Sequence, residues 1–280
     1  MSRKWEDLTI AENFIFSKVL ETDLELCKNL LEVILGFKIE RVEYVEREKT
    51  IETRLDSKGI RLDVYVKAAN GQKIFNIEIQ TTNKDDLAKR TRYYQSILDN
   101  DSLDKGKNYW ELPITYVIFI CTFDYFNKGR HIYTFRNRCD EDMDLMLRDE
   151  TTKIFLNTNG TLNDVNEDLL AFLNYVVGKK SDNPLVNALD KKVQVIKQNK
   201  HWRNEYMFWE AELARQKYLG IQEGIEQGIE QGIEQGIEQG RMESSIEMVR
   251  NFLKAGADID LIKNATGWTE EKILKAAQSN

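Results

Sequence analysis

The sequence predicts an α/β fold with a helical C-terminal extension, on three observations. Two amphipathic helical patterns open the chain, two alternating strands around an Asn-Gly pair follow, and a long apolar strand comes after a further helix. Beyond Pro184 every strong pattern is helical. Strands that alternate with helices in this order are typical of a sheet covered by helices.

The composition limits the functions to be considered. At 280 residues the chain can bury a substantial core and still carry an appendage. The three cysteines are unevenly spaced, which favours a reducing compartment. The two histidines, His131 and His201, lie far apart, which argues against zinc sites and Ser-His-Asp hydrolases. Because the N-terminus is polar and no apolar run approaches roughly 18 residues, we expect a soluble cytoplasmic protein without a membrane span.

Charge is spread unevenly along the chain. The net charge of −7 argues against a simple nucleic-acid binder, since phosphate contacts usually come from a basic surface. Much of the acidity lies in a C-terminal repeat, however, whereas Lys84, Lys89, Arg90 and Arg92 form a basic cluster. Net charge alone is therefore a poor guide to the partner.

Helices and strands follow from periodicity and caps. Residues 8–20 predict a helix begun by Thr9, with Glu12 completing a capping box. The other expected helices are 23–35, stopped by Gly36, then 85–98, 164–177 and a long stretch at 192–218. The expected strands are 39–46, 60–67, 73–80, 114–123, 132–135 and 153–156.

The strands 60–67 and 73–80 flank Asn70-Gly71, the strongest short-range signal for a two-residue type I′ turn. With this turn Ala69 faces Gln72. The register then pairs, on one face, Val66 with Phe75, Val64 with Ile77 and Leu62 with Ile79, and on the other Lys67 with Ile74, Tyr65 with Asn76, Asp63 with Glu78 and Arg61 with Gln80.

This register places the carboxylates of Asp63 and Glu78 directly opposite each other, without an obvious cation from the protein. Cross-strand Cβ atoms lie about 4.5–5.5 Å apart, and like charges there are destabilising. Mg²⁺ is the natural compensating group, because proteins hold it with one or two carboxylates and water. A salt bridge to Arg61 or Lys67 is the alternative. Gln80 points to the same face as Glu78.

An Asp, a hairpin and then Glu-x-(Lys or Gln) resembles the active-site pattern of the PD-(D/E)XK nuclease superfamily. Within it, Arg61-Leu62-Asp63-Val64 and Asn76-Ile77-Glu78-Ile79-Gln80 resemble the Rpn family of bacterial recombination-promoting nucleases, also described as transposases. An Arg and Tyr-Tyr helix and the Gly-rich repeat extend the likeness to Gly240. The resemblance implies a restriction-endonuclease-like core, a mixed sheet flanked by helices, and a DNA endonuclease dependent on Mg²⁺ or Mn²⁺.

The resemblance also implies two sets of site residues. The catalytic set is Asp63, Glu78 and Gln80, with Glu12 as a further member, and Asp63 and Glu78 hold the metal. The substrate-binding set is Arg90, Tyr93, Tyr94 and Gln95. Simpler roles remain open: a helix cap for Glu12, core packing for Tyr93 and Tyr94, and a solvated charge for Arg90.

The C-terminal part contains a Gly-Ile-Glu-Gln repeat from Gly220 to Gly240. A four-residue period drifts about 40° per unit around an α-helix, so glycine and isoleucine form slowly winding stripes. Each glycine costs about 1 kcal/mol relative to alanine in a helix. The repeat is therefore either a loose linker or a helix whose Gly/Ile stripe packs on a second copy, and we expect the second. Residues 245–253, 258–264 and 269–277 predict three short helices, either a helix-turn-helix unit or a packing module.

We expect four segments: a nuclease-like domain at 1–183, a helical extension at 184–219, the repeat at 220–240 and a small helical module at 241–280. The leading hypothesis is a metal-dependent DNA endonuclease that promotes recombination. The alternative is a weak or inactive nuclease-like scaffold that binds DNA or assembles, favoured by Gln80, because an amide orients water but lacks the charge of lysine. Strand transfer is not distinguished from cleavage.

Overall fold

A computed structural model of the chain describes residues 4–51, 60–68, 71–83 and 85–278. The chain divides into two compact units, Met1–Tyr206 and Met207–Asn280. The four-segment division expected from the sequence stays a prediction. Within the described residues, no helix is both long and apolar enough to cross a membrane.

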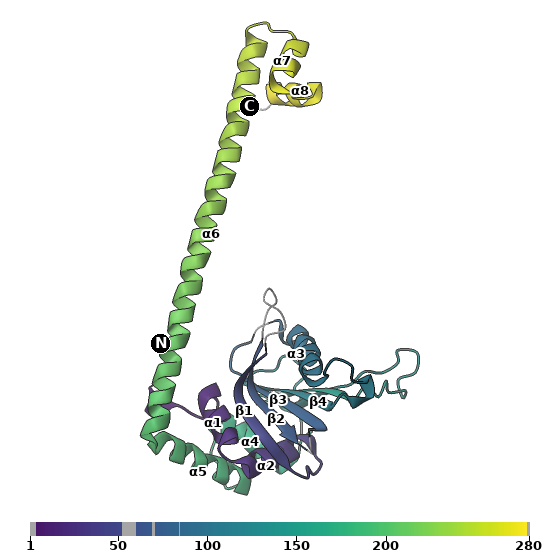
Figure 1. Cartoon of the computed structure of the whole chain (residues 1–280), viewed down its shortest axis with the longest axis vertical. Helices are drawn as coiled ribbons and strands as arrows, with labels where there is room; N and C mark the ends of the chain where they lie inside the picture. The colour runs from purple at the N-terminus through teal and green to yellow at the C-terminus, as the bar shows by residue number, and fades with distance from the viewer. Residues whose placement is uncertain (1–3, 52–59, 69–70, 84, 279–280) are drawn as a thin grey trace. The chain divides into compact units, whose positions relative to one another are not determined.

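Unit 1 contains a mixed sheet, which confirms the predicted fold class (Figure 1). Across the described residues its six strands lie in the order β1-β2-β3-β4-β6-β5. Strands β1 to β3 are antiparallel, β3, β4 and β6 are parallel, and β5 returns antiparallel to β6. The strands are β1 (Val42–Ile51), β2 (Ile60–Ala68), β3 (Lys73–Gln80), β4 (Ile114–Cys121), β5 (Ile132–Phe135) and β6 (Thr151–Asn157).

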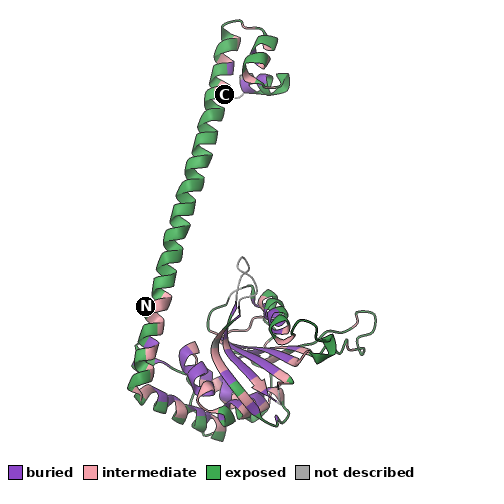
Figure 2. Ribbon diagram, viewed as in Figure 1, coloured by how far each residue is buried: buried purple, intermediate pink, exposed green. Residues whose placement is uncertain are grey.

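Helices cover the sheet and leave the central strands buried, as Figure 2 shows. Helix α3 contacts β4, whereas α1 contacts β1, β2 and β3, and α2 contacts β1. The helices of this unit are α1 (Asn13–Glu21), α2 (Leu24–Leu35), α3 (Leu87–Ser102), α4 (Glu167–Val176) and α5 (Pro184–Gln198), with short 3-10 turns at Trp5–Asp7 and Tyr109–Glu111. The first two turns of α6 (Lys200–Lys254), up to Tyr206, also belong to unit 1.

The predicted hairpin register is confirmed where the strands pair. Backbone pairing runs from Ala68 opposite Lys73 to Val64 opposite Ile77. Gly71 has a φ of +76°, a conformation that glycine adopts without strain. The predicted turn residues Ala69 and Asn70 lie outside the described residues.

Two helix predictions are wrong in their boundaries. Helix α1 begins at Asn13 rather than Leu8, because the Glu12 carboxylate accepts the backbone N–H and the hydroxyl of Thr9 and closes a separate turn before the helix. The long helical stretch expected from 192 is split at Asn199. Its backbone is extended, and its side chain caps α6 by accepting the N–H groups of His201 and Trp202.

An ion-pair network holds α1 in place. Lys18 on α1 lies 3.0 Å from Glu21 and 3.2 Å from Glu205 near the start of α6. The guanidinium of Arg47 on β1 also binds Glu205 and lies 4.7 Å from the ring centroid of Phe14. These contacts fix the start of α1, where Asn13 reaches the hairpin.

Unit 2 is helical. The repeat lies inside α6, which confirms that it is helical, and its side chains from Ile221 to Gln239 are exposed. Val249 of α6, Ile262 of α7 (Ile259–Thr266), and Ile273 and Ala276 of α8 (Glu270–Gln278) form a small core. The predicted C-terminal helices are therefore present, the first of them as the end of α6.

Candidate active site

The Asp63 and Glu78 carboxylates meet where β2 and β3 stop pairing through their backbones. The backbone N–H of Asp63 donates to Glu78 Oε1 at 3.1 Å, and the N–H of Ile79 donates to Asp63 Oδ2 at 3.2 Å. Each carboxylate thus binds the backbone of the opposite strand. The alternation of β2 and β3 produces this arrangement, because Asp63 and Glu78 belong to the same face of the hairpin.

Burial sets the electrostatics of the pair. The Glu78 side chain is only 1% exposed, and burial, followed by repulsion from Asp63, raises the pKa of Glu78 well above its usual value. Burial also raises the pKa of Asp63 to about 6, although the Ile79 N–H, Asn13 and Arg61 favour its charged form. Two ionised carboxylates are therefore costly here unless a cation joins them.

Arg90 of α3 corrects the expectation that the protein offers no obvious cation. Its Nη2 lies 3.8 Å from Glu78 Oε2 and donates to the Tyr94 hydroxyl at 2.9 Å, while Nη1 donates to Gln80 Oε1 at 3.2 Å. The guanidinium is half-buried, so a purely solvated role is excluded. One guanidinium facing two carboxylates still leaves an excess of negative charge.

Asn13 is a site residue that the sequence reasoning missed. Its Nδ2 donates to Asp63 Oδ1 at 2.5 Å, and its Oδ1 is buried without a hydrogen-bond partner among the described residues. The available signal was its position at the start of the first helix, directly after Glu12. The sequence reasoning chose Glu12 because it is acidic.

The structure brings Asp63, Glu78, Gln80, Arg90 and Tyr94 together. The Tyr94 ring is buried, and its hydroxyl accepts a hydrogen bond from Arg90. Tyr94 therefore both packs in the core and contacts a residue of the candidate site.

The other predicted residues lie differently. The Glu12 carboxylate binds Thr9, Tyr93 is partly exposed on α3, and Gln95 donates to Asp99 and to Thr115. Glu78 pairs with Phe119 on β4, and Thr115 lies four residues before Phe119 on the same strand. Gln95 therefore points to a part of the sheet away from Glu78.

The donor set at the site fits a hard cation. Asp63 and Glu78 provide carboxylate oxygens, which Mg²⁺ and Mn²⁺ prefer, and Mg²⁺ ordinarily keeps several water ligands. In the part of the chain that the structure describes, no group of three His, Cys, Asp or Glu side chains is placed to hold a metal.

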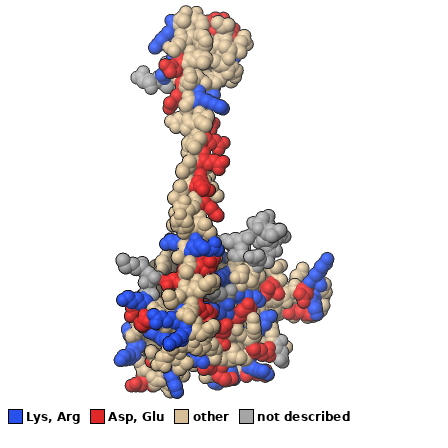
Figure 3. All heavy atoms as spheres, turned by 60° about the vertical axis from the view of Figure 1, so that its left-hand side comes forward, with Lys and Arg blue, Asp and Glu red and all other residues tan. Residues whose placement is uncertain are grey.

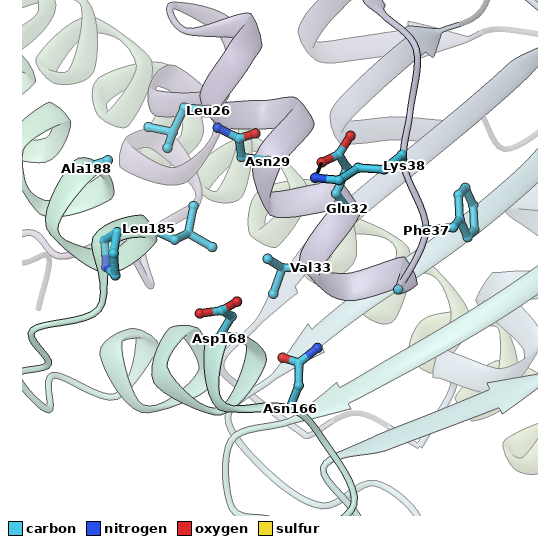
Figure 4. A pocket seen from close by; sticks show the side chains of 12 residues that line it. Leu26, Asn29, Glu32, Val33, Phe37, Lys38, Asn166, Asp168, Leu185 and Ala188 are labelled. Carbon is cyan, nitrogen blue, oxygen red and sulfur yellow. Dashed lines mark hydrogen bonds and ion pairs between the residues drawn. The ribbon is translucent and has the colours of Figure 1, made fainter.

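A separate cavity of about 590 Å³ lies among α2, α4 and α5 (Figure 4). Its charged lining residue Glu32 already binds Lys38 at 2.6 Å and accepts the N–H of Ile39 at 2.9 Å. Asp168 on α4 likewise accepts from Asn183 at 2.6 Å. These carboxylates serve the local structure, so the cavity does not compete with the Asp63–Glu78 pair as the candidate site.

Comparison with known families gives a match to a described family. The model of the PD-(D/E)XK nuclease family transposases covers residues 12–182. This span contains the hairpin, Arg90 and the whole sheet. No curated protein and no solved structure matches the chain.

Proposed function

Because the chain belongs to the PD-(D/E)XK nuclease family transposases, we propose that it is a metal-dependent endonuclease that cleaves DNA phosphodiester bonds and promotes recombination. The observation that carries this proposal is the buried pair of carboxylates, Asp63 and Glu78, each of which accepts a backbone N–H from the opposite strand. A nuclease-like function follows from the family. The metal, the endonucleolytic mode, the recombination role and a cytoplasmic location are parts of the proposal.

Asp63 and Glu78 hold Mg²⁺ or Mn²⁺ in this proposal. When bound, the cation stabilises charge on the phosphate and makes a coordinated water more acidic. Gln80 keeps its amide N–H groups for orienting that water, since its oxygen accepts from Arg90. Arg90 is suited to phosphate because its guanidinium offers several donors in a fixed plane.

DNA is the proposed substrate. Lys89 and Arg92 are exposed on α3, the helix that carries Arg90, and Tyr93 is partly exposed beside them. Cations on such a surface bind the DNA backbone without reading sequence. Lys84, which belongs to the same basic cluster in the sequence, lies outside the described residues.

A nuclease-like scaffold of low or no activity is the second candidate. Gln80 favours it, because the amide provides no positive charge to lower the pKa of the attacking water. The cost of burying Asp63 beside Glu78 argues against it, since a site without a ligand gains nothing from that repulsion.

We also propose that the chain self-associates through the repeat. The five isoleucines from Ile221 to Ile237 are each 50–59% exposed. A Cβ added at Gly224, Gly228 or Gly232 meets nothing within 4 Å, so a second helix can approach the backbone there. Figure 3 shows acidic side chains along one side of this part of α6.

Deleting residues 220–240 is expected to lower the mass of the protein in solution as measured by light scattering. An unchanged mass contradicts self-association through the repeat.

Plasmid nicking tests the proposed function. Wild-type protein is expected to nick supercoiled DNA with Mg²⁺ and to be inactive in EDTA, and Asp63→Ala is expected to be inactive in both. Asp99→Ala is the matched control, because Asp99 lies on α3 and binds Gln95 away from the pair. Metal-independent nicking, or equal nicking by wild type and Asp63→Ala, contradicts the proposal.

A further inference from the structure

Asn76 is a buried polar residue without a complete set of partners. It lies in the middle of β3 and is 0% exposed, and neither its Nδ2 nor its Oδ1 has a hydrogen-bond partner among the described residues. Its cross-strand partner Tyr65 is also 0% exposed, and the Tyr65 hydroxyl is equally unpartnered within the same residues. The buried Asn76 amide and Tyr65 hydroxyl thus place unpaired polar groups inside the sheet, near the candidate site.

Such a residue costs stability. A buried donor or acceptor left unpaired typically costs about 1–3 kcal/mol, and buried unsatisfied groups in native proteins often have a catalytic or ligand-related role. A valine or isoleucine at position 76 fits a central strand without this cost. Packing alone therefore does not account for an asparagine here.

The position of Asn76 indicates its use. It lies two residues before Glu78, so both side chains point to the same face of β3. Successive side chains on one face of a strand lie about 7 Å apart, and the Asn76 amide has no other partner among the described residues, so it is available to donate to the Glu78 carboxylate. On the other side of the pair, the Asn13 amide donates to Asp63. Each carboxylate thus has one asparagine side chain on its side of the pair.

We propose that Asn76 is a positioning residue whose carboxamide donates to the Glu78 carboxylate when a divalent cation is bound, and so holds that carboxylate in the orientation that binds the cation. This inference rests on the proposed function. A neutral amide suits the task, because it fixes a carboxylate by a hydrogen bond and leaves intact the negative charge that attracts the cation. A lysine or arginine in its place would compete with the metal.

Calorimetric titration of the full-length protein with Mn²⁺ tests the proposal without relying on activity. The variant Asn76→Leu keeps the branched shape and removes both polar atoms. Loss of a side chain that orients a metal ligand typically weakens metal binding about 10- to 100-fold, and we expect at least the lower figure. The melting temperature in EDTA is expected to be unchanged or higher, because two unpaired polar atoms disappear.

Thr158→Val is the matched control. Thr158 is buried, its Oγ1 is unpartnered among the described residues, and it follows β6 rather than the hairpin. The control is expected to bind Mn²⁺ like the wild type. Asn76→Thr, which keeps one donor in a side chain of similar size, is expected to bind with an affinity between those of wild type and Asn76→Leu, and it replaces Asn76→Leu if leucine prevents folding.

Three results overturn the proposal. If Asn76→Leu and Asn76→Thr both bind Mn²⁺ like the wild type, Asn76 does not position Glu78. If Thr158→Val loses as much affinity as the Asn76 variants, the loss reflects a general change in packing. If the wild type itself binds no Mn²⁺, the proposed metal-dependent function fails, and this inference fails with it. A wild type that binds Mn²⁺ while both Asn76 variants bind equally well refutes this inference alone.

Discussion

The hairpin and the repeat use carboxylates in opposite ways. Glu78 is 1% exposed and contacts groups from β2 and α3, whereas Glu226, Glu230 and Glu234 of the repeat are exposed. Long-range contacts place Glu78, and its burial costs stability. Local helical periodicity alone places the repeat glutamates, at little cost. The difference teaches that a costly, buried carboxylate fits our proposal that the hairpin holds a ligand, whereas inexpensive, exposed carboxylates fit our proposal that the repeat presents a surface.

The glycines and isoleucines of the repeat strengthen this contrast. Each glycine within α6 costs about 1 kcal/mol relative to alanine, and no described residue packs closely on the glycines between Gly220 and Gly240 to offset that cost. In the hairpin the cost is electrostatic, and in our proposal a cation relieves it. In the repeat the cost is conformational, and in our proposal a second helix relieves it.

The largest expected effect concerns the pH dependence of stability. The pKa of Asp63 is about 6 in the folded protein against 3.8 ordinarily, so the folded state binds this proton more tightly than the unfolded state does. The contribution of Asp63 to stability therefore falls as the pH rises from about 4 to about 6, by roughly 3 kcal/mol in total.

Asp63→Asn lacks this titration. In EDTA, its free energy of unfolding is expected to rise relative to that of the wild type between pH 4 and pH 7, by up to about 3 kcal/mol. Urea unfolding at several pH values measures the difference. A difference between the two proteins that stays constant with pH would show that Asp63 is not a costly buried carboxylate.

The next effect concerns Arg90. The substitution Arg90→Ala removes the donor shared by Glu78, Gln80 and Tyr94, and is expected to lower the nicking rate about a hundredfold, as the loss of one preorganised donor typically does. Arg92→Ala, on the exposed side of the same helix, is expected to weaken DNA binding only modestly. Equal losses in the two variants would place Arg90 outside the site.

The smallest effect concerns the repeat. Replacing Ile229 with glutamine keeps the helix and is expected to weaken self-association by about 1 kcal/mol, because a half-exposed isoleucine loses its burial against the second copy. Sedimentation at several concentrations measures the change. Glu230→Gln is the control and should leave the association unchanged or slightly stronger. A monomeric wild type, or a larger effect of Glu230→Gln, argues against the Gly/Ile stripe as the interface.

The sequence sufficed for the features that depend on local pattern. Strand alternation around Gly71 predicted the pairing of Val64 with Ile77, and hence the meeting of Asp63 and Glu78. The asparagine at position 13 escaped prediction, because it reaches Asp63 across fifty residues of sequence and only the packing of α1 on the sheet brings the two together.

Competing local interactions explain the other misses. Thr9 and Glu12 have the residue types of a capping box, but their hydrogen bonds close a turn ahead of α1. Gln95 follows Tyr94 directly, yet the helical rotation of about 100° per residue turns its amide toward Thr115 rather than Glu78. Which helical neighbour enters a site depends on how the helix docks, and periodicity does not fix that.

Calorimetric melting of wild type and Asp63→Asn, each in EDTA and in Mg²⁺, tests the central claim most directly. If Asp63 and Glu78 hold a divalent cation, Mg²⁺ raises the melting temperature of the wild type, by an amount that corresponds to about 2.7 kcal/mol at a hundredfold excess over Kd. The variant then shows no response to Mg²⁺ and is at least as stable as the wild type in EDTA. A wild type indifferent to Mg²⁺, together with a variant less stable in EDTA, would contradict the claim and assign Asp63 to a structural ion pair.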